Sequence, residues 1–200
     1  PCVLDMLDGS SVPASGRAQT FKVEKWNIGG EGGHDYITAE PGTGRLFVSR
    51  GTHVMVVDGK TGKVLGDIAD TPRVHGAGLA IREKKGFTTN AGDSTVTMFD
   101  LETLLPIQKI PVHVGGLDGI MYDDVSRKIV LTNHSNPGTL VLIDAATGEM
   151  SGTTILEDRA PEGAAADGKG KLYVNNETKN TIQVIDQYNM KVVSSWPLAP

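Results

Sequence analysis

The 200-residue chain is poor in cysteine, in basic charge and in long apolar runs, and each shortage argues against a class of protein. Its single cysteine, Cys2, cannot form a disulfide within the chain or complete the C-x-x-C-H sequence that attaches c-type haem. The 19 Lys and Arg against 24 Asp and Glu give a net charge of −5. General nucleic-acid binding needs a basic face, so we expect no nucleic-acid partner. No apolar run approaches the roughly 18 residues that suggest a membrane-spanning helix.

Glycine and proline are present in the amounts that a turn-rich protein needs. There are 25 Gly and 10 Pro but only 5% aromatic residues, which indicates many tight turns between short strands. The length is compatible with a single domain. Residues 1–20 resemble no other part of the chain and lack the basic start and apolar core of a signal peptide. We interpret them as a leader that is mostly disordered, or as the tail of a processed segment.

Four copies of one β-rich unit fill the rest of the chain. In each copy a short β-branched or aromatic strand is followed by a polar turn and by an apolar strand that ends in an aspartate. The first of these strands are residues 46–50, 86–90, 129–133 and 172–176, and the closing aspartates are Asp58, Asp100, Asp144 and Asp186. The aspartates lie 42, 44 and 42 residues apart, a spacing typical of solenoids, propellers or arrays. Each precedes a turn, so we expect these carboxylates to accept backbone N–H bonds and not to bind ligands.

This period holds about four strands and no helical pattern, which predicts an all-β fold, a β-propeller of four-stranded blades. We expect blades at about 33–69, 71–110, 114–155 and 160–198. Residues 21–28 match the outer strand of the fourth unit, with Trp26 and Trp196 as equivalent packing residues. An additional outer strand does not fit a ring of four blades. We therefore expect further blades beyond the C-terminus and an open arc with exposed strand edges.

The repeat resembles that of a known family. The sequence from Asn176 to Val193, with its strand ending in Asn-Asn, its polar turn and its strand ending in Ile185-Asp186, is similar to the YVTN-type repeat of YncE-like propellers. The resemblance covers about residues 21–200, and the Trp-Asp dipeptide of WD40 repeats is absent. It implies seven blades in total and an exported protein, periplasmic or extracellular. It implies no particular reaction.

Ionisable residues occupy the predicted start of every innermost strand. These residues are Asp35, His75, Asp118 and Glu162, and most are followed by Gly or Ala, which lets strands crowd around a central channel. Adjacent strands are antiparallel, so the ends of the second strands lie on the same face. Those ends add Arg50, Asn90, Asn133, His134 and Asn176 as candidate ligand-binding residues. The sequence therefore predicts that carboxylate, imidazole and amide groups converge on one channel mouth.

Two interpretations of this channel mouth stay open. It could bind a polar ligand or a divalent metal ion. Oxygen donors suit Ca²⁺ or Mg²⁺, and His75 would admit Zn²⁺ or another transition metal. Alternatively, the polar groups line a solvated channel and bond to loop backbone. No cofactor is required by either interpretation.

We therefore expect a non-catalytic binding or scaffold module whose partner is a small ligand or a protein at the channel mouth. Two alternatives remain. The Glu-Gly pairs at Glu31 and Glu162 resemble the start of gluconolactonase-type propellers, which would imply a metal-dependent hydrolase. The other alternative is a purely structural surface repeat protein. A more distant resemblance, to the haem-carrying propellers of nitrite reductases, would make His75 or His134 an axial ligand.

Overall fold

A computed structural model describes residues 22–157 and 159–198, and the predicted leader at 1–20 lies outside this range. The described residues form sixteen strands and no helix, so none of their elements is a helix able to cross a membrane. Each blade is one antiparallel sheet whose strands follow chain order. The blades are β1 (Ile37–Ala39), β2 (Arg45–Ser49), β3 (Val54–Asp58) and β4 (Val64–Ile68); β5 (Val74–Ala80), β6 (Lys85–Asn90), β7 (Thr95–Asp100) and β8 (Pro106–Pro111); β9 (Leu117–Asp123), β10 (Lys128–Asn133), β11 (Thr139–Asp144) and β12 (Met150–Ile155); and β13 (Pro161–Ala166), β14 (Lys171–Asn176), β15 (Thr181–Asp186) and β16 (Lys191–Pro197).

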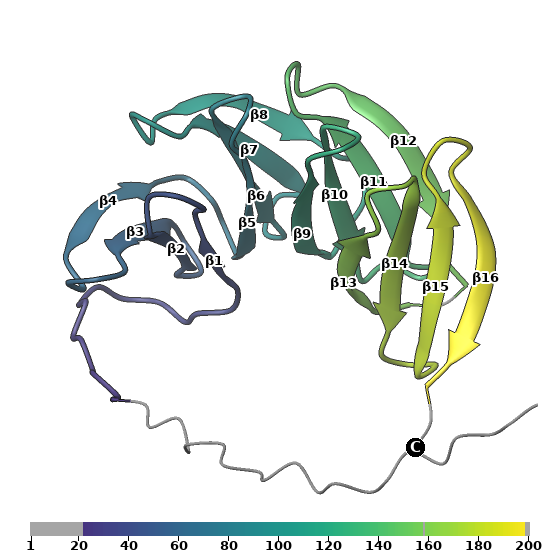
Figure 1. Cartoon of the computed structure of the whole chain (residues 1–200), viewed down its shortest axis with the longest axis horizontal. Helices are drawn as coiled ribbons and strands as arrows, with labels where there is room; N and C mark the ends of the chain where they lie inside the picture. The colour runs from purple at the N-terminus through teal and green to yellow at the C-terminus, as the bar shows by residue number, and fades with distance from the viewer. Residues whose placement is uncertain (1–21, 158, 199–200) are drawn as a thin grey trace, which may run out of the picture.

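The four blades stand side by side in an open arc (Figure 1). The first strands, β1, β5, β9 and β13, line the inside of the arc, and the last strands, β4, β8, β12 and β16, form its outer rim. Neighbouring first strands contact each other from blade to blade. The architecture is that of a β-propeller, as the repeat predicts.

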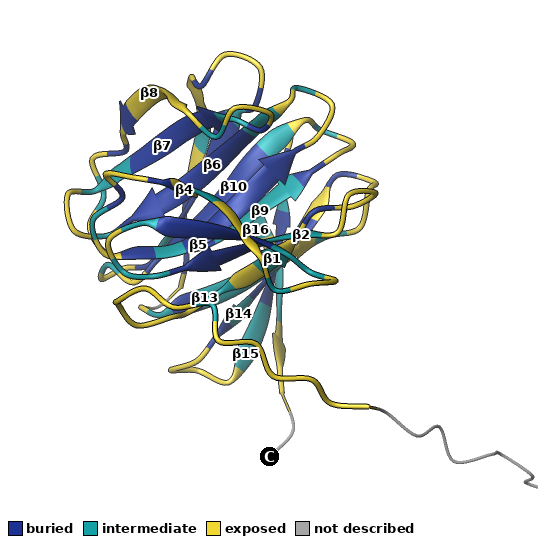
Figure 2. Cartoon of the chain, turned by 90° about the vertical axis from the view of Figure 1, so that its left-hand side faces the viewer, coloured by how far each residue is buried: buried dark blue, intermediate teal, exposed yellow. Residues whose placement is uncertain are grey.

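The core lies between the blades, and the middle strands of the second and third blades are buried on both faces (Figure 2). Strands β7 and β11 are apolar and almost wholly buried because a blade packs against each side of them. Strand β3 is equally buried, with the second blade on one side and Ile28 of the segment before β1 on the other. One cluster, which contains Phe47 and Phe99, joins the first two blades, and another, around Phe87 and Ile129, joins the second and third. The outer strands expose most of their residues, which explains why their sequences are more polar.

The closing aspartates form turns in all four blades, which confirms the prediction. Each Oδ1 accepts the backbone N–H groups of the residues two and three positions later. These hydrogen bonds hold the pKa of Asp58 and Asp100 below the ordinary value. For Asp144 the largest contribution is the hydrogen-bonded ion pair with Lys128. Together with the hydrogen bonds of the turn it lowers the pKa of Asp144 to about 2.

The predicted outer strand at 21–28 is wrong, because residues 22–36 contain no strand. A strand needs a partner backbone to receive its hydrogen bonds, and the described chain places none beside this segment. Its side chains pack along the first blade instead. Trp26 lies over the turn after β3, where a Cβ added to Gly62 would be 2.5 Å from the indole. Ile28 packs against the cluster of Val48, Met55 and Val57.

Candidate metal and ligand site

The innermost strands of the second, third and fourth blades share an irregularity at the predicted site residues. In each, two residues of the inner strand stand opposite one residue of the next strand, so the strand contains a β-bulge. The paired residues are His75-Gly76 opposite Thr89, Asp118-Gly119 opposite Thr132, and Glu162-Gly163 opposite Asn175. A bulge bends the strand and redirects a side chain. The ionisable residue followed by glycine is thus the sequence signature of this bulge.

Threonines from the second strands set the distance between neighbouring blades at the site. Thr89 donates its hydroxyl to the backbone oxygen of Asp118 over 2.7 Å, and Thr132 does the same to Glu162 over 2.5 Å. A Cβ added to Gly119 would lie 2.2 Å from the Glu162 backbone oxygen. Only glycine allows the two inner strands to approach this closely. The two carboxylates therefore come from adjacent blades held together by backbone contacts.

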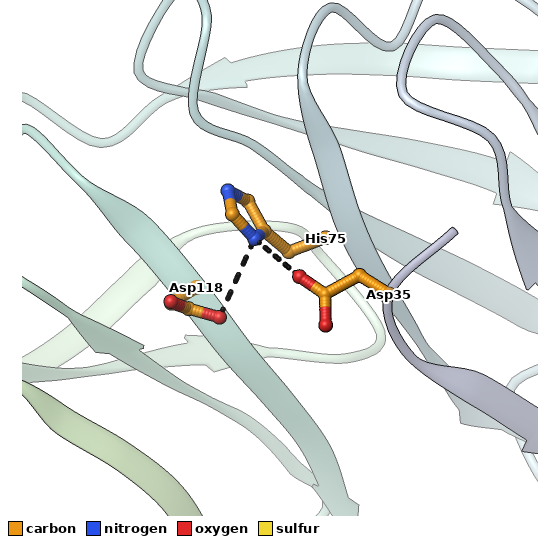
Figure 3. A group of neighbouring side chains, drawn as sticks. All are labelled: Asp35, His75 and Asp118. Carbon is orange, nitrogen blue, oxygen red and sulfur yellow. Dashed lines mark hydrogen bonds and ion pairs between the residues drawn. The ribbon is translucent and has the colours of Figure 1, made fainter. Parts of the chain in front are cut away.

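His75 lies between two carboxylates (Figure 3). Its Nδ1 is 2.7 Å from Oδ2 of Asp35 and 3.5 Å from Oδ1 of Asp118. The three side chains come from three consecutive blades. Each can present one ligand atom to a shared point, and the three atoms lie within 4.8 Å of one another.

His134 forms a second group on the other oxygen of Asp118. Its Nε2 is 3.3 Å from Oδ2 of Asp118 and 3.0 Å from Oε2 of Glu162. The histidine follows β10 directly, and its backbone N–H donates to the backbone oxygen of Gly116 over 2.7 Å. This contact ties the loop after β10 to the loop before β9. The ligand atoms of the second group also lie within 4.8 Å of one another.

Tyr36 belongs to the site and is missed by sequence reasoning. Its hydroxyl donates to Oε1 of Glu162 over 2.6 Å, so it reaches from the first blade to the fourth. Burial, and then the hydrogen bond to Glu162, raise the pKa of Tyr36 well above the ordinary value, which keeps it a donor. The only available signal is that a tyrosine follows Asp35, where glycine follows the equivalent residues of the other blades.

The electrostatic balance of the cluster favours a cation. Asp35, Asp118 and Glu162 bring three carboxylates to two imidazoles. Asp118 is buried, and this burial raises the pKa of its carboxyl. The neighbouring charge of Glu162 and, more weakly, that of Asp35 act in the same direction, whereas His75 and His134 oppose them. A bound positive ion would relieve both the burial and the repulsion.

The structure does not bring the three predicted asparagines to this group. Asn90, Asn133 and Asn176 are all buried within their own blades. The amide of Asn90 donates to the hydroxyls of Thr95 and Thr97. Asn133 and Asn176 use their side chains in the turns that follow their strands. Asparagine is favoured at such turns because its amide substitutes for backbone partners.

Arg50 also has a different partner. Its Nη2 donates to the backbone oxygen of Gly30 over 3.0 Å, which holds the segment before β1 against the first blade. A different arginine lies beside the site: Arg73 lines a hollow of about 230 Å³ together with His34, Asp35 and His75. Through this hollow a small molecule can reach Asp35 and His75 of the first group.

The comparisons with known proteins support the fold and leave the function open. No family model matches the chain, and no curated protein matches it. Among solved structures 1203 chains resemble it, so the fold is too widespread to select a function. One of them is the hydrazine synthase of Kuenenia stuttgartiensis, with a TM-score of 0.74 and 19% sequence identity. The match covers 91% of this chain and 52% of that chain, so this chain spans about half the length of the protein it resembles. A likeness at this identity shows the β-propeller fold alone.

Proposed function

We propose that this protein is a non-catalytic binding propeller that takes a divalent metal ion at the mouth of its central channel. The observation that supports the proposal is the pair of histidines on either side of Asp118, each also in contact with a further carboxylate. Membership of the YncE-like family, a seven-bladed ring and a periplasmic or extracellular location belong to the proposal as well. They rest on the sequence resemblance.

The donor set favours a transition metal over calcium or magnesium. Ca²⁺ and Mg²⁺ take oxygen ligands almost exclusively, whereas imidazole suits Zn²⁺, Co²⁺, Ni²⁺ and Cu²⁺. Each group here combines one imidazole with two carboxylates. Three protein ligands leave a coordination position for water or for a ligand. A bound ion would therefore also present an open position to a small polar partner.

The first test is metal content by mass spectrometry, combined with thermal melting before and after chelation. An ion present at 100 times its dissociation constant stabilises the folded state by about 2.7 kcal/mol. For a chain of this size that is about 5–10 °C in Tm. Asp118→Asn should lose this response. Asp124→Asn should keep it, because Asp124 lies after the other end of β9 and forms an exposed ion pair with Arg82 of the second blade. Purified protein without metal, whose melting temperature changes with neither added ions nor chelator, would contradict the proposal. The polar groups would then line a solvated channel, and the role would be structural.

A metal-dependent hydrolase of the gluconolactonase type is the second candidate. The hollow beside Asp35 and His75 favours it, because a substrate there would lie next to the first group of ligand atoms. Arg73 also lines the hollow, and an arginine beside it suits a substrate with a carboxylate or phosphate. Metal-dependent opening of a lactone ring, absent from Asp118→Asn, would favour the hydrolase. Metal uptake with no turnover would favour the binding module.

A further inference from the structure

We propose that the site holds two divalent ions and that the carboxylate of Asp118 bridges them. The inference rests on the proposed metal binding and adds its stoichiometry and geometry. One ion would be bound by Asp35, His75 and Asp118, the other by Asp118, His134 and Glu162. The β-bulges hold His75, Asp118 and Glu162. The loop after β10 holds His134, and the segment before β1 holds Asp35.

The two oxygens of Asp118 face different histidines. Oδ1 is 3.5 Å from Nδ1 of His75, and Oδ2 is 3.3 Å from Nε2 of His134. A carboxylate that gives one oxygen to each of two ions has this orientation. Each histidine is also closer to a second carboxylate, Asp35 at 2.7 Å and Glu162 at 3.0 Å. The arrangement is therefore nearly the same on both sides of Asp118.

The spacing of the donors favours two ions over one. Zinc binds nitrogen and oxygen ligands at about 2.0–2.2 Å, so two ligands of one ion are at most about 4.4 Å apart. The donors of Asp35, His75, Asp118, His134 and Glu162 divide into two groups that each span up to 4.8 Å, and only Asp118 belongs to both. The histidine–carboxylate distances within each group are 2.7–3.5 Å, so small side-chain adjustments place one ion between the donors of one group. A single ion would leave the other histidine and its carboxylate without metal.

Charge also favours a second ion. Three carboxylates carry −3 when ionised, so one divalent ion leaves a net charge of −1 at a site whose central carboxylate, Asp118, is buried. A second ion changes the sum to +1, which water-derived or substrate anions can neutralise. Paired ions about 3.5–4 Å apart bind both oxygens of such an anion.

The two ion positions differ in their surroundings. Tyr36 donates to Oε1 of Glu162, which leaves Oε2 on the side of His134 and orients it for the second ion. The first position instead adjoins the hollow lined by Arg73. We therefore expect the position at His134 to be the more preorganised, and the position at His75 to be the one that meets an incoming ligand.

The test is a titration of the whole chain with Zn²⁺ by calorimetry, with metal analysis of the dialysed protein, and electron paramagnetic resonance with Mn²⁺. The wild type should bind two ions per chain, and the manganese form should show the exchange coupling of a bridged pair. Asp35→Asn and Glu162→Gln should each bind one ion and lose the coupling. Asp124→Asn is the matched control, because it also removes one carboxylate, at the surface after β9. This variant should still bind two ions.

The possible outcomes distinguish the paired site from the proposed metal binding on which it rests. One ion per chain in the wild type would overturn the paired site and leave metal binding intact. Two ions without magnetic coupling would overturn the Asp118 bridge. No bound ion would overturn both proposals. The wild-type resonance spectrum shows whether Asp118 bridges the two ions, even where a variant fails to fold. Far-ultraviolet circular dichroism identifies a variant that does not fold.

Discussion

Gly119→Ala tests the contact that brings Asp118 and Glu162 together. The added Cβ would be 2.2 Å from the Glu162 backbone oxygen and 2.7 Å from the hydroxyl of Thr132. A carbon and a carbonyl oxygen approach no closer than about 3.3 Å without repulsion, so the Glu162 backbone must move by about 1 Å. The backbone oxygen would then lose its hydrogen bond from the Thr132 hydroxyl, which is buried.

The expected cost follows from these two effects. Overpacking of a well-packed interior costs about 1–3 kcal/mol, and a buried hydroxyl left without its partner costs about 1–3 kcal/mol more. Gly119→Ala should therefore lower the free energy of unfolding by about 2–6 kcal/mol. Displacement of Glu162 should also remove the ion position at His134. Gly115→Ala is the control, because no atom lies within 4 Å of its added Cβ, and it should change stability by less than about 0.5 kcal/mol.

Urea unfolding followed by circular dichroism measures the difference. The midpoint should fall for Gly119→Ala with an unchanged slope, since the surface exposed on unfolding is the same. Zinc titration of the same variant should show one ion fewer than the wild type. Equal midpoints for Gly119→Ala and Gly115→Ala would refute the close approach of β9 and β13, and with it the geometry of the site.

Two further predictions concern a turn and the site. Asp144 has a folded pKa of about 2, below that of an unfolded aspartate, so its stabilising charge is complete above about pH 4 and is lost as the pH falls from 4 towards 2. Asp144→Asn should cost about 1 kcal/mol at pH 7, less than the full shift implies because its pair with Lys128 is partly exposed, and should flatten acid unfolding below pH 4; an unchanged acid profile would contradict this. Tyr36→Phe removes the donor that orients Glu162 and should weaken binding of one ion by about 10-fold in a zinc titration, with the other unchanged; two unaltered affinities would exclude this positioning role.

The repeat made most of the fold predictable from local patterns. Short β-branched strands and aspartate-led turns recur with one period, and their chemistry depends on neighbours only a few residues away, as the turn at Asp58 illustrates. The outer strand at 21–28 failed for the opposite reason. Its sequence matches a strand, but strand formation depends on a partner backbone that the pattern itself does not provide. The sequence could not separate the asparagines from the site, because the same residue type serves turns and ligand sites. Their hydrogen bonds within their own blades distinguish the two roles, as those of Asn90 with Thr95 and Thr97 illustrate.

The sequence by itself determined that ionisable residues begin the inner strands, since His75, Asp118 and Glu162 recur at equivalent places and are followed by glycine. Tertiary structure decided which of them meet. The sharing of Asp118 between two histidines, and the reach of Tyr36 to Glu162, depend on the angle between blades and on the β-bulges. Those features arise from the packing of side chains distant in sequence. A repeat specifies the blade, whereas the distances between site residues of different blades are set by how the blades pack together.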